Sequence, residues 1–190
     1  MLRGDGDRRD FFRNAMGEWV EQVLQRTGSR VSQRRYDRPP GALPEVAFLA
    51  ACTRCGECVK ICPPKAIITA PTDAGLAAGT PYIDARFQPC TVCPDMPCVT
   101  ACPTGALTLP PGGWSGYRLG SLKLDPDRCI AFHGTACGVC ARHCPVGERA
   151  LALDEGGRPI IRVEGCVGCG VCVRACVTTP SSLALTPLEE

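Results

Sequence analysis

The sequence predicts an α+β fold of low regular structure, in which short β-hairpins and short helices form two small lobes. Sixteen of the 190 residues are cysteine, whereas aromatic residues make up only 5%. The cysteines fall into four groups of four, which begin at Cys52, Cys90, Cys129 and Cys166. This nearly constant spacing indicates one structural unit used four times. Because few large side chains are present to form a core, disulfides or inorganic centres are expected to help hold the chain together.

The chain divides into three parts. Residues 1–38 are rich in arginine and lack cysteine, and Phe12, Met16, Trp19 and Val23 recur at helical spacing. They predict a basic N-terminal arm with an amphipathic helix over about residues 8–27. Residues 39–47 form a proline-rich linker that a helix cannot pass through. Residues 48–190 form the four-cluster domain.

Each repeat of this domain is expected to hold a cysteine-bearing loop, a short helical turn and a brief apolar stretch. The stretches cover residues 66–68, 106–109, 150–153 and 183–185. Residues 122–124 and 160–163 also predict short strands, since apolar and β-branched residues recur there. Antiparallel hairpins between such strands are the regular structure that we expect.

The first cysteine group has the spacing C-x2-C-x2-C-x3-C-P, which is found in bacterial ferredoxins. Three cysteines at two-residue gaps form a loop around three irons of a cubane. The fourth lies beyond a helical turn and points towards a second cluster, and the proline ends that turn. The lobes are therefore expected to be bacterial-ferredoxin-like dicluster lobes.

The other groups vary this pattern without losing a ligand. The second and third contain longer gaps, and Val177 stands where the fourth group should have proline. We predict that all sixteen cysteines bind four [4Fe–4S] clusters. The four groups are Cys52, Cys55, Cys58 and Cys62; Cys90, Cys93, Cys98 and Cys102; Cys129, Cys137, Cys140 and Cys144; and Cys166, Cys169, Cys172 and Cys176.

Other uses of the cysteines fit less well. Zinc sites use paired Cys-x2-Cys knuckles and have no need of three consecutive cysteines at two-residue gaps. A disulfide framework is typical of small exported proteins, and no signal peptide is evident. His133 and His143 are interpreted as surface or supporting residues, because every cysteine group is already complete.

Charge and motifs exclude several classes of function. The formal charge of +2 counts the thiols as neutral, and four clusters with their thiolates would bring it to about −6. A nucleic-acid surface is not indicated, and no stretch reaches the roughly 20 apolar residues of a transmembrane segment. No G-x-G-x-x-G motif follows a strand and no acid–base pair is visible. We therefore predict an electron carrier that is not an enzyme.

Several strings between the cysteines resemble the NapG/MauM-type ferredoxins. They are residues 38–45, 48–56, 79–82, 97–107 and 129–132. These ferredoxins are similar to the four-cluster β-subunits of molybdenum enzymes. The resemblance implies that the chain relays electrons to or from a larger redox enzyme, such as a molybdoenzyme or a membrane quinol-oxidising subunit. An alternative is a cytoplasmic assembly or maturation factor for an oxidoreductase.

The resemblance also implies how the cysteine groups pair. By analogy with those β-subunits, the first group pairs with the fourth, and the second with the third. Cys62 and Cys176 would then cross between the outer groups, and Cys102 and Cys144 between the inner groups. Pairing of consecutive groups is the alternative.

The N-terminal arm bears on the compartment. Residues 8–13 resemble the recognition motif of a twin-arginine export signal, which the nitrate-reductase members of the family carry. Glu18, Glu21 and Arg26 interrupt the apolar region that should follow. We therefore expect a cytoplasmic protein. The alternative is a periplasmic protein, exported by the twin-arginine route or with a partner.

Overall fold

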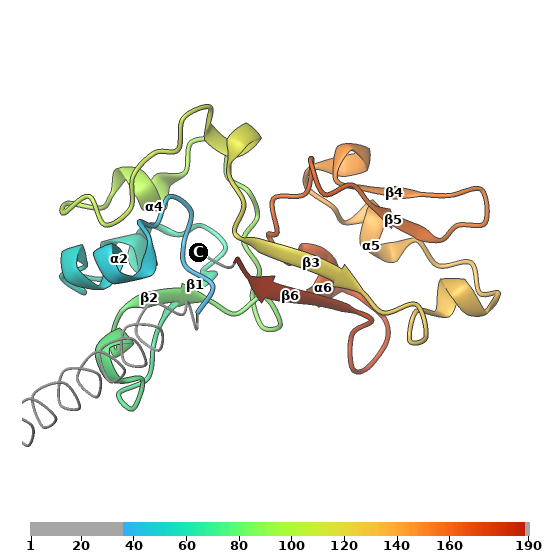
Figure 1. Cartoon of the computed structure of the whole chain (residues 1–190), viewed down its shortest axis with the longest axis horizontal. Coiled ribbons are helices and arrows are strands. Elements are labelled where there is room, and N and C mark those ends of the chain that lie inside the picture. The colour runs from blue at the N-terminus through green and yellow to red at the C-terminus, as the bar shows by residue number, and fades with distance from the viewer. Residues whose placement is uncertain (1–35, 189–190) are drawn as a thin grey trace, which may run out of the picture. The chain divides into compact units, whose positions relative to one another are not determined.

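Two lobes follow one another along the chain in the computed structural model, which describes residues 36–188 (Figure 1). Residues 36–116 are called the first lobe and residues 120–188 the second lobe. Each contains short helices and short antiparallel two-stranded sheets, in agreement with the predicted α+β arrangement. The amphipathic helix predicted over residues 8–27 lies outside the described residues.

The first lobe is built around one hairpin. Its elements are α2 (Glu45–Ala51), α3 (Glu57–Ile61), β1 (Ile67–Thr69), η1 (Gly75–Ala77), β2 (Pro81–Ile83), α4 (Pro97–Thr100) and η2 (Gly113–Gly116). β1 and β2 pair antiparallel with Ile67 opposite Ile83, and both side chains are buried. The stretch predicted at 106–109 is not a strand, although Leu107 makes an isolated bridge with Ala42.

The second lobe contains two sheets. Its elements are β3 (Gly120–Leu124), η3 (Ile130–His133), α5 (Val139–Arg142), η4 (Gly147–Arg149), β4 (Leu151–Leu153), β5 (Pro159–Ile161), α6 (Val171–Ala175) and β6 (Leu183–Pro187). β4 pairs with β5, and β3 pairs with β6, both antiparallel. The first and last strands of the lobe are thus neighbours, and the strands predicted near residues 122–124 and 160–163 are confirmed.

A short helix follows each cysteine-bearing loop. α3, α5 and α6 begin after Gly56, Gly138 and Gly170, each in the left-handed conformation that glycine adopts without strain. α3 contacts α4, and α5 contacts α6. Each of these helices therefore packs on the helix of the neighbouring cysteine group in its own lobe.

The proline-rich segment predicted as a linker packs against the first lobe. Pro39 and Pro40 are fully buried, and α2 already begins at Glu45. Arg38 is 0% exposed, and its guanidinium donates to the Glu45 carboxylate and to Thr80 Oγ1. A buried guanidinium needs such partners, and they hold the segment on the lobe.

The two lobes also contact each other. Arg174 Nε of α6 donates to the Phe87 carbonyl of the first lobe at 3.3 Å. Val167 and Cys169 belong to the same buried cluster as the first-lobe residues Met96 and Ile83. The cysteine loop that precedes α6 is therefore packed against the first lobe.

Candidate iron–sulfur centres

Four cavities are each lined by four cysteines, so that each of the sixteen predicted ligands lines one of the four cavities. Within residues 36–188, no three Cys, His, Asp or Glu side chains are arranged to hold a single metal ion. The sets are Cys52, Cys55, Cys58 and Cys102 (site A); Cys62, Cys90, Cys93 and Cys98 (site B); Cys144, Cys166, Cys169 and Cys172 (site C); and Cys129, Cys137, Cys140 and Cys176 (site D).

The predicted pairing of the first group with the fourth, and of the second with the third, is wrong. Cys62 lies with the second group and Cys102 with the first. Cys144 lies with the fourth group and Cys176 with the third. The reason is the helix packing: α3 lies on α4 and α5 on α6, so each fourth cysteine faces the neighbouring group of its own lobe. Consecutive groups therefore pair.

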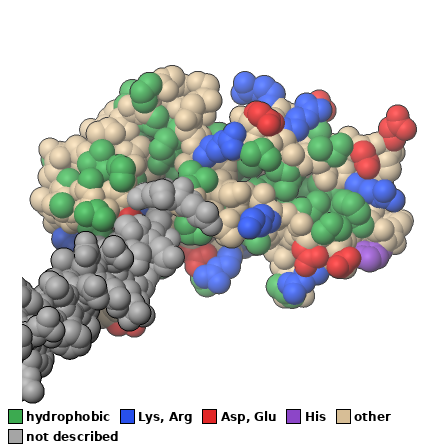
Figure 2. Space-filling model, viewed as in Figure 1, with side chains coloured by type: hydrophobic (Ala, Val, Ile, Leu, Met, Phe, Trp, Pro, Cys, Tyr) green, Lys and Arg blue, Asp and Glu red, His purple; other side chains and the backbone are tan. Residues whose placement is uncertain are grey.

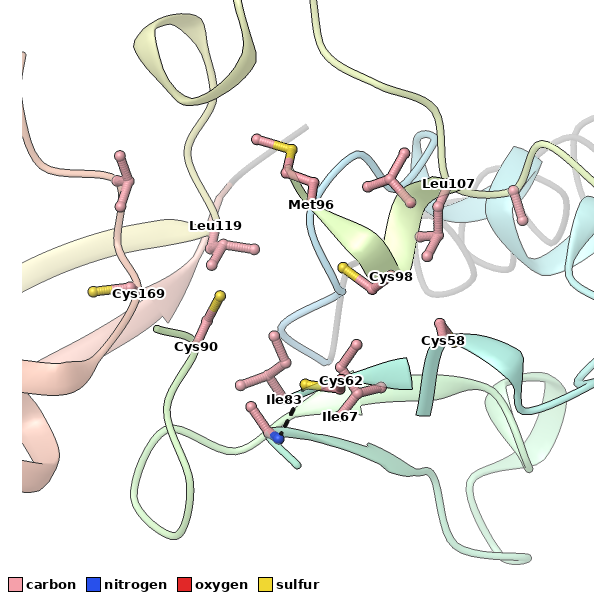
Figure 3. Close-up of a cluster of buried hydrophobic side chains, with 14 of the residues drawn as sticks. Cys58, Cys62, Ile67, Ile83, Cys90, Met96, Cys98, Leu107, Leu119 and Cys169 are labelled. Carbon is pink, nitrogen blue, oxygen red and sulfur yellow. Dashed lines mark hydrogen bonds between the residues drawn. The ribbon is translucent and has the colours of Figure 1, made fainter. Parts of the chain in front are cut away.

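Site B illustrates how the chain forms such a cavity (Figure 3). Cys62 follows α3, and its Sγ accepts the Ala66 backbone N–H at 3.3 Å (dashed line in Figure 3). Met96, 1% exposed, precedes α4 and closes one side of the cavity. The indole of Trp114 lines another side and donates its Nε1–H to the Cys93 carbonyl at 2.8 Å. Sequence reasoning missed both residues, because no motif marks them.

The thiols in these cavities are suited to a positively charged group. Burial raises the pKa of Cys58 and Cys169 to about 11, and of Cys90 and Cys98 to about 12. Neighbouring thiols add to each of these rises. Four thiolates can therefore share a cavity only if positive charge compensates them, and the core of a [4Fe–4S] cluster supplies that charge. The cavities fit the predicted clusters.

Cys102 of site A and Cys176 of site D are exceptions, because hydrogen bonds outweigh burial and lower the pKa of each thiol. Burial acts to raise the pKa of Cys176, but hydrogen bonds with the hydroxyls of Ser182 and Thr178, and smaller contributions from the Thr178 backbone and the Ser181 hydroxyl, outweigh it and lower the pKa to about 6. Cys176 Sγ lies 3.2 Å from Thr178 Oγ1 and 3.3 Å from Ser182 Oγ. The missing proline at Val177 was the sequence signal that this loop differs. It did not identify the hydroxyls.

Electrostatic interactions between thiols of different sites give the order of the sites. Burial is the main cause of the raised pKa of Cys98 in site B. The thiol of Cys58 in site A raises this pKa further. In the same way, Cys169 of site C acts on Cys90 of site B, and Cys140 of site D acts on Cys172 of site C. The sites therefore follow one another as A, B, C and D. Figure 3 shows Cys169 beside Cys90 at the edge of site B.

The two histidines line none of the four cavities. Both are exposed. His133 Nε2 lies 2.9 Å from the Asp127 carbonyl, and His143 Nδ1 lies 2.9 Å from the Val139 carbonyl. These positions agree with their interpretation as surface residues.

Comparison with known families agrees with the cavities. Residues 51–106 and residues 121–177 each match a family described as a 4Fe-4S dicluster domain. The first match contains every cysteine of sites A and B, and the second every cysteine of sites C and D. Two dicluster domains give four clusters, and the number of cysteines, sixteen, fits four for each cluster.

Curated relatives extend the similarity over most of the chain. The ferredoxin-type protein NapG of Escherichia coli is 38% identical over 194 residues, which cover 95% of this chain and 84% of NapG. The methylamine utilization ferredoxin-type protein MauM of Methylorubrum extorquens is 38% identical over 160 residues, or 80% of this chain and 73% of MauM. The polyferredoxin protein MvhB of Methanothermobacter marburgensis is 36% identical over 61% of this chain and 24% of MvhB. No solved structure matches the chain.

Proposed function

The chain belongs to the NapG/MauM-type ferredoxins, which transfer electrons, and we propose that it relays single electrons along sites A, B, C and D to or from a larger redox enzyme. The continuity of the four sites carries this proposal. Thiols of A and B, of B and C, and of C and D are close enough to act on each other's pKa. A cluster chain of this kind can connect two partners that never meet.

In this proposal the cysteines and the other side chains have different roles. The sixteen cysteines hold the four clusters as thiolates, three from one group and one from its neighbour at each site. Each cluster supplies the ability to accept and return one electron. The remaining side chains exclude water and set the potential of each site through burial and hydrogen bonds.

The two terminal sites are the places where partners would bind. At site A, Cys55 is exposed, and it is the only exposed cysteine of the sixteen, all of which are described. Leu76 is 65% exposed, and its carbonyl accepts Arg54 Nη2 at 2.9 Å beside this site. At site D, Val177 follows Cys176 and is 56% exposed. Single exposed apolar side chains are common on protein surfaces, so the exposure of Cys55 at one end of the series of sites carries this assignment.

The surface charge of the second lobe indicates that a partner is recognised mainly by shape and apolar contact. On the face drawn in Figure 2, Lys and Arg side chains are interspersed with Asp and Glu side chains over the second lobe. A surface of mixed sign steers a partner weakly. We therefore propose a redox protein as partner and no nucleic acid, and we assign the chain no substrate site of its own.

The compartment is part of the proposal. Among residues 36–188, no helix has both the length and the apolar character to cross a membrane. The acidic residues Glu18 and Glu21 after the arginine pair favour the cytoplasm. Cell fractionation tests this: a periplasmic pool cleaved after the arginine pair would contradict it.

Affinity isolation of the intact protein from its native cell, under anaerobic conditions, tests the relay. We expect a stoichiometric complex with a redox enzyme, in which reducing the enzyme or its donor reduces the clusters of this chain. A transient complex formed only with an enzyme that lacks its cofactors would contradict the relay and support the assembly role instead.

A further inference from the structure

The loop after Cys176 carries hydroxyl groups where the other fourth cysteines are followed by proline. Residues 177–182 read Val-Thr-Thr-Pro-Ser-Ser, whereas Pro63, Pro103 and Pro145 follow the fourth cysteines of the other groups. In this loop, Thr178 Oγ1 lies 3.2 Å and Ser182 Oγ 3.3 Å from Cys176 Sγ. Two hydroxyls thus reach the sulfur that crosses over to site D.

Both hydroxyls act as donors to this sulfur when the cluster is bound. A cysteine that binds iron is a thiolate and has no proton to donate, so the hydroxyls must supply theirs. Thr178 Oγ1 also accepts the Ser182 backbone N–H at 2.9 Å. One lone pair of Thr178 Oγ1 is therefore occupied, and the hydroxyl proton of Thr178 remains free to be donated to Cys176 Sγ.

The loop is held in place by further bonds. Ser182 is 4% exposed, and its carbonyl accepts the Asp125 N–H at 2.8 Å. The Leu183 N–H donates to Ser181 Oγ at 3.1 Å. A hydrogen bond in such a part-buried, fixed setting is stronger than one in water.

The other crossing cysteines have weaker or different donors. Cys62 accepts the Ala66 N–H at 3.3 Å, and Cys102 accepts the Leu107 N–H at 3.5 Å. Thr104 stands two residues after Cys102, as Thr178 does after Cys176, but its Oγ1 lies 3.8 Å from the sulfur. Among the described residues, only Cys176 has two hydroxyls within 3.5 Å.

We propose that Ser182 and Thr178 give site D the highest reduction potential of the four, so that electrons in the chain collect at this end. Reduction adds one electron and forms or breaks no bond, and part of the added negative charge resides on the ligand sulfurs. Hydrogen-bond donors stabilise that charge more than they stabilise the oxidised state, which raises the potential. The direction of electron flow rests on the proposed relay, whereas the potential of site D does not.

Potentiometric titration followed by electron paramagnetic resonance tests this proposal on the anaerobically purified full chain. We expect one of the four midpoint potentials, the highest in the wild type, to shift to a more negative value in Ser182→Ala and in Thr178→Val. The shift should be larger in the double variant. Resonance Raman spectra should show a raised Fe–S(Cys) stretching frequency, because the lost donors leave more electron density for the iron–sulfur bond.

Two variants serve as controls. Thr178→Ser keeps the hydroxyl and should keep the wild-type potentials. Thr186→Val removes a hydroxyl from β6 that donates to the Ser121 carbonyl at 3.3 Å and does not line site D, so no midpoint should move.

Three results would overturn the proposal: no midpoint moves, the midpoint that moves is not the highest in the wild type, or either single variant loses a cluster. The last result would show that the hydroxyls hold the cluster and do not tune it. None of these midpoints depends on a partner, so a failure of the relay would leave the result unchanged.

Discussion

Arg38 and Glu45 form a buried ion pair with two parallel hydrogen bonds. Arg38 Nε lies 2.9 Å from Glu45 Oε2, and Nη2 lies 2.5 Å from Oε1. The guanidinium also donates to Thr80 Oγ1 at 2.8 Å and to the Pro81 carbonyl at 2.9 Å. It stacks 4.6 Å from the ring centroid of Phe48, which lines site A. The pair therefore supports one wall of site A.

Glu45→Gln should destabilise the first lobe strongly. It leaves the charge of Arg38 buried without a counter-charge, a change that costs about 3–5 kcal/mol in comparable buried pairs. We expect a lower thermal midpoint, and about four irons, those of site A, should be lost before the others. Absorbance and iron analysis during heating measure this loss. Glu57→Gln is the control, because Glu57 pairs with Lys60 on the surface of the same lobe. Equal midpoints for the two variants would contradict this role.

Gly170→Ala should disturb the junction of the lobes. A Cβ at Gly170 would lie 2.2 Å from the Cβ of Ala85 in the first lobe. Gly56 occupies the matching position before α3, with nothing within 4 Å. Both glycines have positive φ, +82° and +77°, so Gly56→Ala carries the same backbone strain without the clash.

We expect Gly170→Ala to lower the thermal midpoint more than Gly56→Ala does. It should also weaken the magnetic interaction between the clusters of sites B and C, measured in the fully reduced protein. If the two variants behave alike in both measurements, close packing at Gly170 does not set the distance between these sites.

Trp114→Ala should make site B sensitive to oxygen. The variant removes a side chain that lines the cavity and its hydrogen bond to the Cys93 carbonyl. Water and oxygen then reach the cluster more easily. On exposure to air, about four irons per chain should be lost faster than in the wild type. Leu109→Ala, at a side chain that is 61% exposed, should leave the rate of loss unchanged. Equal rates for both variants would contradict the shielding role.

The sequence predicted what is local in this protein. The spacing within each cysteine group sets the loop and the short helix, and alternating apolar residues set most of the strands, so both could be inferred without tertiary information. The pairing of the cysteine groups could not be inferred from the sequence. All four groups have nearly the same local pattern, and the choice of partner for Cys62 depends on α3 packing against α4.

Two further features escaped prediction for physical reasons. Arg38 appears in the sequence as one more arginine of a basic arm, and only its burial against Glu45 and Phe48 reveals its role. Ser182 lies six positions after Cys176, and its hydroxyl reaches the sulfur only because the loop folds back. Neither contact follows from periodicity or from a motif.

The pairing of consecutive groups is the central claim, and the iron content of double variants tests it most directly. Cys62→Ala removes one cluster and should leave about 12 of about 16 irons in the anaerobically purified protein. Adding Cys90→Ala removes a second ligand of the same site B, so this double variant should still hold about 12 irons. Adding Cys166→Ala instead removes a ligand of site C, and about 8 irons should remain. The reverse result, with about 8 irons for the pair Cys62 and Cys90 and about 12 for the pair Cys62 and Cys166, would contradict the account.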